Sequence, residues 1–152
     1  MLPWLISGLF LGACETVPTD SNRASSETVT ASTSLPPQTL NVGDCGLFVW
    51  AGEARRFILF AQTGRTAKYA SGGQELALTP IETDETAVSG DLYGQIPVQS
   101  FHDAMGRRYD LNLSHASEIQ DGLRYSEGSW RYKNDEGWSV VTPVYGLSTC
   151  QA

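Results

Sequence analysis

The sequence predicts an all-β fold, a small antiparallel barrel or sandwich of about eight strands closed by one disulfide, after a disordered tether. Three observations lead to this fold class. From Leu40 onward, short runs of alternating apolar and polar residues recur between turn residues. No stretch of about ten or more residues carries a helical stripe of apolar side chains. Finally, the cysteines Cys45 and Cys150 bracket these runs.

The first half of the domain contains four runs with strand character. The second of them, Arg56-Phe57-Ile58-Leu59-Phe60-Ala61, is apolar on both faces, which predicts a central strand. Pro80 is expected to end the fourth run. The acidic segment that follows, from Ile81 to Val88, predicts an exposed loop or a hairpin arm. The four expected strands cover residues 44–50, 56–61, 66–70 and 75–79.

The second half opens with a weakly alternating run from Leu92 to Phe101, in which Pro97 predicts an edge strand or a bulge. The run Arg108–Leu113 has the cleanest alternation in the chain. His115–Gln120 is expected to form one helical turn, and Asp121-Gly122 is a hairpin signal. Two further expected strands cover residues 129–133 and 138–141, and residues 143–147 lead on to Cys150.

Length, composition and charge limit the function. A chain of 152 residues suits one folded domain, and 41% hydrophobic residues suffice for a core. A net charge of −7 argues against nucleic acid as a partner, because phosphates need a basic surface. The same charge fits either a surface that repels anionic lipid headgroups or one that meets a cationic partner. In an exported protein, Cys45 and Cys150 form an even pair, so we expect a disulfide between them.

The first 14 residues predict export. An apolar run too short to span a bilayer ends in Leu11-Gly12-Ala13-Cys14. This ending resembles the processing site of bacterial lipoproteins, in which the cysteine is lipidated and the chain is cut before it. The resemblance implies a signal peptide over residues 1–13 and a lipid bilayer as partner, through acylated Cys14. No Lys or Arg precedes the apolar run, so either the α-amino group supplies the usual positive charge or the true start of the chain lies upstream.

A tether is expected between this anchor and the folded domain. Residues 14–39 are rich in Ser, Thr and Pro and poor in large apolar side chains, so they cannot offset the entropy cost of ordering. The β domain is then expected over residues 40–152. Glu15 follows the lipidated cysteine. By resemblance to the enteric sorting rule, this residue favours the outer membrane of the bacterial envelope over the inner membrane.

No residue pattern supports catalysis. His102-Asp103 could pair a base with a carboxylate, but adjacent residues on a strand point to opposite faces. A metal trio of His115, Glu118 and Asp121 would need a helical turn and lacks Cys/His ligand spacing. Cys45 has Cys150 as its natural partner. The sequence therefore predicts no catalytic residue, no metal site and no cofactor.

The aromatic residues give a better indication of function. Most of the tryptophans and tyrosines are expected in cross-strand packing, and a few could form a stacking platform for a sugar or an anchor for a protein partner. The segment Ser89-Gly90-Asp91-Leu92-Tyr93 has the form Ser-Gly-x-x-Tyr.

This form resembles the membrane-bound lipoprotein inhibitors of chicken-type lysozyme, which share the lipidated N-terminus, the small antiparallel barrel and a terminal disulfide. The resemblance implies that Ser89 enters the lysozyme cleft and meets the catalytic carboxylates, while Gly90 and Tyr93 shape the loop. A basic residue should assist, and Arg107 or Arg108 are the candidates.

The sequence thus predicts an envelope-anchored lipoprotein with a non-catalytic β domain that binds a ligand or has a structural role. The ligand and the oligomeric state stay open. The alternatives are an inhibitor of a cationic cell-wall hydrolase of the lysozyme type and a hydrolase with an unrecognised site.

Overall fold

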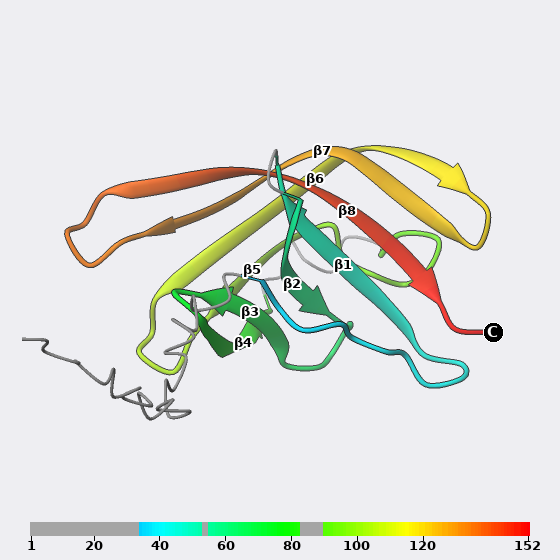
Figure 1. Ribbon diagram of the computed structural model, residues 1–152, viewed down its shortest axis with the longest axis horizontal. Coiled ribbons are helices and arrows are strands. Elements are labelled where there is room, and N and C mark those ends of the chain that lie inside the picture. Colours follow the sequence, from blue (N-terminus) through cyan, green and yellow to red (C-terminus); the bar gives the residue numbers. More distant parts are fainter. Residues whose placement is uncertain (1–33, 53–54, 83–89) are drawn as a thin grey trace, which may run out of the picture.

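The computed structural model describes residues 34–52, 55–82 and 90–152, and these residues form a closed barrel of eight antiparallel strands. Each strand pairs with the next one along the chain, and β1 pairs with β8 to close the barrel (Figure 1). The strands are β1 Cys45–Ala51, β2 Arg56–Ala61, β3 Ala67–Ser71, β4 Gln74–Ile81, β5 Val98–His102, β6 Arg108–Ile119, β7 Gly122–Lys133 and β8 Ser139–Cys150. The predicted all-β fold class is confirmed, and the barrel is the alternative that forms.

The predicted disulfide is confirmed as well. Cys45 lies directly opposite Cys150 in the β1–β8 ladder, and the two cysteines are bonded across 105 positions of sequence. The bond therefore joins the first strand to the last at the place where the barrel closes. We call this end of the barrel the disulfide end. The other end, where β2 begins at Arg56, is called the Arg56 end.

Three local predictions were wrong. Residues 115–119 continue strand β6 instead of forming a helical turn, because β7 supplies hydrogen-bonding partners as far as Ile119. Pro80 does not end its strand, since it pairs with Phe101 inside the β4–β5 ladder. The run that begins at Leu92 becomes a strand only from Val98 onward, and Pro97 precedes it. A closed barrel also has no edge strand for Pro97 to mark.

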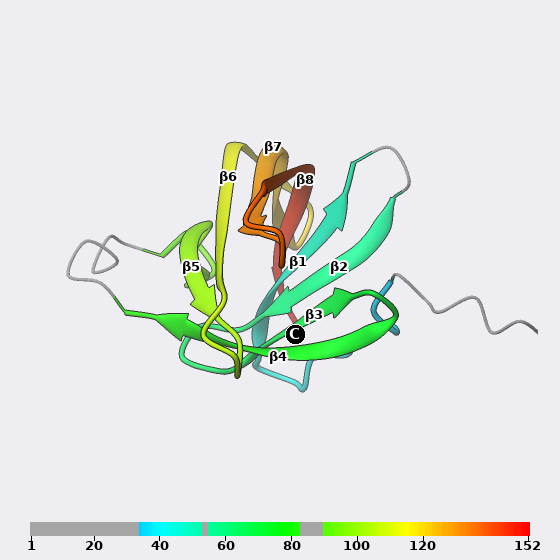
Figure 2. The same ribbon diagram turned by 90° about the vertical axis from the view of Figure 1, so that its left-hand side faces the viewer.

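The barrel interior is filled by inward-facing side chains of every strand. Trp130 packs against Tyr69 and Tyr109, with ring centroids 5.0 and 5.5 Å apart, and Phe101 lies 6.0 Å from it. The largest fully buried side chains are Trp130, Tyr109, Phe101, Leu47, Leu59, Leu78, Leu111 and Val49. Figure 2, which is turned by 90°, shows the strands arranged around this core. Because the interior is filled, a ligand is expected to bind on the outer wall or at the barrel ends.

The outer wall of β2 and β3 is covered by the segment that precedes β1. Leu35 is buried against Phe60 and Ala70, and its N–H donates to the carbonyl of Phe57 at 2.7 Å. Residues 34–39, which the sequence placed in the tether, thus lie against the barrel. This cover explains why Arg56–Ala61 is apolar on both faces. Within the described residues, no helix is long and apolar enough to cross a membrane.

Candidate functional site

The segment that carries the Ser-Gly-x-x-Tyr form lies at the disulfide end. Ser89 lies outside the described residues, whereas Gly90 is exposed and Tyr93 is half-buried. Asp91 holds this segment in place. One of its carboxylate oxygens accepts the N–H groups of Tyr93 and Gln95 at 2.8 and 3.0 Å.

The second carboxylate oxygen of Asp91 faces the barrel. It accepts the hydroxyl of Tyr125 at 2.8 Å and the hydroxyl of Ser148. Both hydroxyl-bearing residues are buried, and Ser148 has no exposed surface. Burial raises the pKa of Tyr125, and the hydrogen bond to the Asp91 carboxylate raises it further. Asp91 therefore fastens the connection that leads to β5 onto β7 and β8.

The same loop geometry occurs three times in the described chain. In each loop an Asp or Asn side chain accepts the N–H groups two and four positions later. The fourth residue of each loop is a glycine with φ between 70 and 83°, a conformation that favours glycine. The loops are 91–95, 103–107 and 134–138. Residues Asp91 to Tyr93 of the proposed motif therefore belong to a recurrent turn that needs no ligand to explain it.

The expected basic partner of this motif is not where the sequence placed it. Arg107 lies directly before β6, and Arg108 is the first residue of that strand. Both lie at the Arg56 end, whereas Gly90 lies at the opposite end of the barrel. They cannot assist a loop at the disulfide end. Arg65 is better placed, because it lies in the β2–β3 loop, where the Thr63 hydroxyl donates to the carbonyl of Gly94 at 2.5 Å. Arg65 is exposed and lies 3.5 Å from Asp44.

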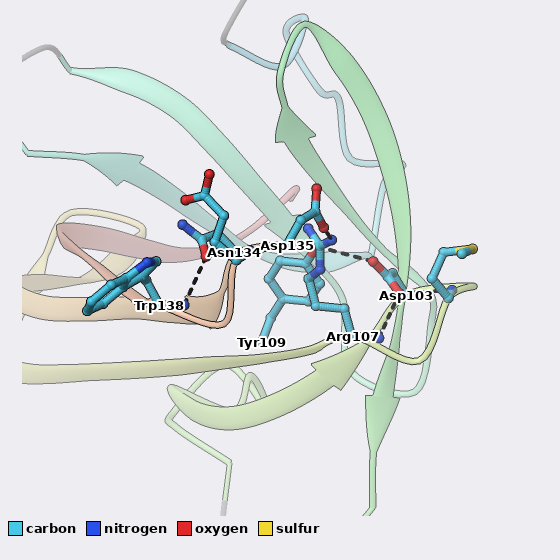
Figure 3. Close-up of polar contacts among 8 residues, drawn as sticks. Asp103, Arg107, Tyr109, Asn134, Asp135 and Trp138 are labelled. Carbon is cyan, nitrogen blue, oxygen red and sulfur yellow. Dashed lines mark hydrogen bonds and ion pairs between the residues drawn. The ribbon is translucent and has the colours of Figure 1, made fainter.

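The Arg56 end carries a bridge between two hairpin loops (Figure 3). Arg107, in the β5–β6 loop, forms an ion pair with Asp135 in the β7–β8 loop. Asp103 accepts the Tyr109 hydroxyl at 3.2 Å. Figure 3 shows the Trp138 ring on the side of its loop away from Arg107, and this ring is 71% exposed.

Cations gather beside this bridge. Four of the ten Lys and Arg residues of the chain line one cavity of about 480 Å³ together with two carboxylates, so its lining is net positive although the protein is acidic. The four cations are Arg107, Arg108, Arg131 and Lys133. Partial burial alone would raise the pKa of Asp110, but hydrogen bonds from Ser100 and Arg108, and the charges of Arg108 and Arg131, outweigh it and lower this pKa. The potential at this end therefore favours negative charge.

A groove of about 740 Å³ lies on the outer wall, where the β7–β8 register shifts between Tyr125 and Ser129. Glu127 is the one charged residue among its described lining residues, which combine polar side chains with apolar ones such as Pro143 and Val144. The Tyr145 ring forms one side of the groove and stacks on Trp50, with ring centroids 5.7 Å apart and an angle of 11°. The side chains of Asn112, Ser129 and Tyr145 make no hydrogen bond to another described residue. They are free to bind a ligand.

A histidine and a carboxylate meet beside this groove, but not in a catalytic arrangement. His115 Nδ1 lies 3.3 Å from Glu127 Oε2 and 3.2 Å from the hydroxyl of Ser114. A Ser-His-acid relay needs the hydroxyl and the acid on different ring nitrogens. Here both contact the same nitrogen, and the His115 and Glu127 side chains are both exposed.

The other candidates for catalysis or metal binding are not brought together. His102 is exposed on the outer face of β5, and Asp103 turns away from it to serve its own loop. His115 contacts neither Glu118 nor Asp121. The part of the chain that the structure describes contains no group of three His, Cys, Asp or Glu residues that could hold a metal ion. Cys14, the expected lipid attachment site, lies outside the described residues.

Comparisons of the chain with family models, with curated proteins and with solved structures find no match. The function is therefore inferred from the chemistry of the described surface.

Proposed function

We propose that the protein is a lipid-anchored component of the bacterial envelope whose β-barrel binds a ligand without catalysis. The Cys14 signal supports the anchor, with the outer membrane as its expected location. The observation that carries the binding proposal is the outer groove beside Tyr145. It combines a stacked aromatic pair with free, uncharged hydrogen-bonding groups. A filled barrel interior leaves the outer wall as the place for an extended ligand.

The chemistry of the groove suits a sugar chain. The apolar face of a sugar ring stacks on an aromatic ring, while its hydroxyl and amide groups need hydrogen-bonding partners of both kinds. Tyr145 supplies the ring, and Asn112 and Ser129 supply donors and acceptors. A volume of about 740 Å³ is within the range of small-molecule sites. Glycan of the cell wall is the ligand class that an envelope-anchored protein would meet.

The test is cosedimentation of the full chain carrying Cys14→Ser with insoluble peptidoglycan. We expect the protein with an unchanged groove to sediment with peptidoglycan. Tyr145→Ala or Asn112→Ala should reduce its affinity about tenfold. Trp138→Ala is the matched aromatic control, because Trp138 is exposed but lies outside the groove. Equal binding by Tyr145→Ala and the wild type, or no binding by either, would refute the glycan proposal.

An inhibitor of a lysozyme-type hydrolase is the second candidate. It is supported by the segment from Gly90 to Tyr93, which Asp91 fastens at the disulfide end while Leu92 stays 73% exposed. A fixed loop loses less conformational entropy when it enters a cleft. The net charge of −7 would attract a cationic enzyme. In this proposal Ser89 is the inserted hydroxyl, and Arg65 replaces Arg107 and Arg108 as the basic partner.

A further inference from the structure

The Arg56 end carries most of the positive charge of this acidic protein. Six of the ten Lys and Arg residues of the chain lie on its loops and strand ends, namely Arg55, Arg56, Arg107, Arg108, Arg131 and Lys133. Arg107 and Arg108 are engaged in ion pairs. The side chains of Arg131 and Lys133 are exposed and make no hydrogen bond or ion pair with another described residue. Their charges are therefore available to an anionic partner.

Two hairpin loops at this end present large apolar side chains to solvent. Met105, on the β5–β6 loop, is 90% exposed, and Trp138, at the end of the β7–β8 loop, is 71% exposed. The ion pair between Arg107 and Asp135 joins the two loops (Figure 3). Each loop is also held by its own side-chain-to-backbone hydrogen bonds. Apolar side chains are thus held in place beside cations, and a fixed loop loses less conformational entropy when it binds.

The N-terminal segment joins the barrel at the same end. The Leu35 N–H donates to the carbonyl of Phe57 at 2.7 Å, and Phe57 is the second residue of β2, next to Arg56. Only residues 15–34 separate Leu35 from Cys14, the expected lipid attachment site. A lipid on Cys14 would therefore connect the bilayer to the Arg56 end of the barrel.

We propose that the Arg56 end docks on an anionic lipid surface, with Trp138 and Met105 among the headgroups and the cations against lipid phosphates. This inference rests on the proposed lipid anchor, which brings a bilayer to this end. Tryptophan is favoured at the membrane–water interface, and anionic headgroups attract Lys and Arg side chains. The disulfide end also exposes apolar side chains, among them Ile119, but the exposed carboxylates of Glu118 and Asp121 flank it, and anionic lipid would repel them. Docking would therefore leave the disulfide end turned away from the bilayer.

The test measures whether the Trp138 ring enters lipid. The full chain carrying Cys14→Ser is mixed with vesicles of phosphatidylglycerol and brominated phosphatidylcholine, because bromine atoms quench tryptophan fluorescence on contact. The quenching that disappears in Trp138→Phe belongs to Trp138, so lipid contacts of the apolar residues 1–13, which both proteins share, do not contribute. We expect Trp138 to be quenched in these vesicles, and much less in vesicles of brominated phosphatidylcholine alone or at high salt.

The absence of Trp138 quenching would overturn the proposal and favour an acidic protein as the partner of this end. Because Cys14→Ser carries no lipid, that result would leave the anchor itself, which membrane fractionation tests, unchallenged.

Charge variants make the test specific. Arg131→Gln combined with Lys133→Gln should lower the affinity for anionic vesicles, followed by Trp138 quenching, about tenfold. The control, Lys68→Gln combined with Arg124→Gln, removes the same charge from exposed positions nearer the disulfide end and should have little effect. Glu136→Gln should strengthen binding, because Glu136 is an exposed carboxylate on a docking loop. Equal weakening by the two pairs of substitutions would show that the Arg56 end does not direct the docking.

Discussion

Asp91 offers the sharpest test of how the barrel holds its longest connection. In Asp91→Ala, the buried hydroxyls of Tyr125 and Ser148 lose their common acceptor. Each buried polar group that is left without a partner costs about 1 to 3 kcal/mol, so the two together should lower the free energy of unfolding by about 2 to 6 kcal/mol. The N–H groups of Tyr93 and Gln95 also lose an acceptor, and the corresponding pair of loop contacts in Asp103→Ala measures this part of the loss.

Asp103→Ala is the matched control. Asp103 accepts the same pair of loop N–H groups and one tyrosine hydroxyl, that of Tyr109, at the longer distance of 3.2 Å. Its loop geometry equals that of Asp91, but it serves no second buried hydroxyl. We expect a loss of about 1 to 2 kcal/mol. The comparison separates the effect of the loop from the effect of the buried acceptor.

The assay is urea unfolding followed by tryptophan fluorescence. A double-mutant cycle with Tyr125→Phe adds a second measurement, since removing the hydroxyl should make the loss of Asp91 less costly by about 0.5 to 3 kcal/mol. Equal losses in Asp91→Ala and Asp103→Ala would show that the buried hydroxyls of Tyr125 and Ser148 do not depend on Asp91. Strict additivity in the cycle would show the same for Tyr125.

Cys14→Ser should move the protein from the membrane fraction to the soluble fraction or leave it uncleaved, and an unmodified N-terminus downstream of Cys14 in mass spectra of the wild type would disprove lipidation. Reducing Cys45–Cys150 frees a loop of 105 residues and should lower stability by about 4 to 5 kcal/mol in the chain-entropy model, as a drop in melting temperature; unchanged melting would contradict this. Ser89→Ala should weaken lysozyme inhibition five- to a hundredfold, by about 1 to 3 kcal/mol, and the absence of inhibition by the wild type at micromolar concentration would exclude the inhibitor function. The pKa of Tyr69 is 10.0 in the unfolded chain and about 12 in the folded barrel, so the contribution of its neutral hydroxyl to stability is complete below pH 10.0 and should be lost as the pH rises to about 12. The free energy of unfolding, measured against pH, should fall over this range. Tyr69→Phe should make the fall less steep.

The sequence allowed the strands to be predicted because alternation is a local signal. Barrel and sandwich could not be separated, because closure depends on the pairing of β1 with β8, whose partners are about a hundred residues apart. The sequence also failed to predict that strand β6 continues through His115, because this part of the strand depends on partners elsewhere in the chain. Its partners on β7 stabilise an extended backbone, although His115 itself has a positive φ of 54°.

The candidate sites were less predictable than the fold. The sequence around Asp91 indicates only a turn. Its role as a buried acceptor could not be predicted, because its partners Tyr125 and Ser148 lie 34 and 57 positions away in the sequence. The three loops, by contrast, carry a visible signal, an Asp or Asn three positions before a Gly. The groove beside Tyr145 could not be anticipated, since it arises from a register shift between β7 and β8.

We propose that the barrel binds its ligand on the outer wall, at the groove beside Tyr145. The most direct measurement is NMR mapping of backbone amide shifts while soluble peptidoglycan fragments are added to the full chain carrying Cys14→Ser. If the ligand binds in the groove, the shifts should concentrate at Asn112, Ser129 and Tyr145. Shifts confined to Gly90–Gln95 at the disulfide end, or no shifts at all, would contradict it.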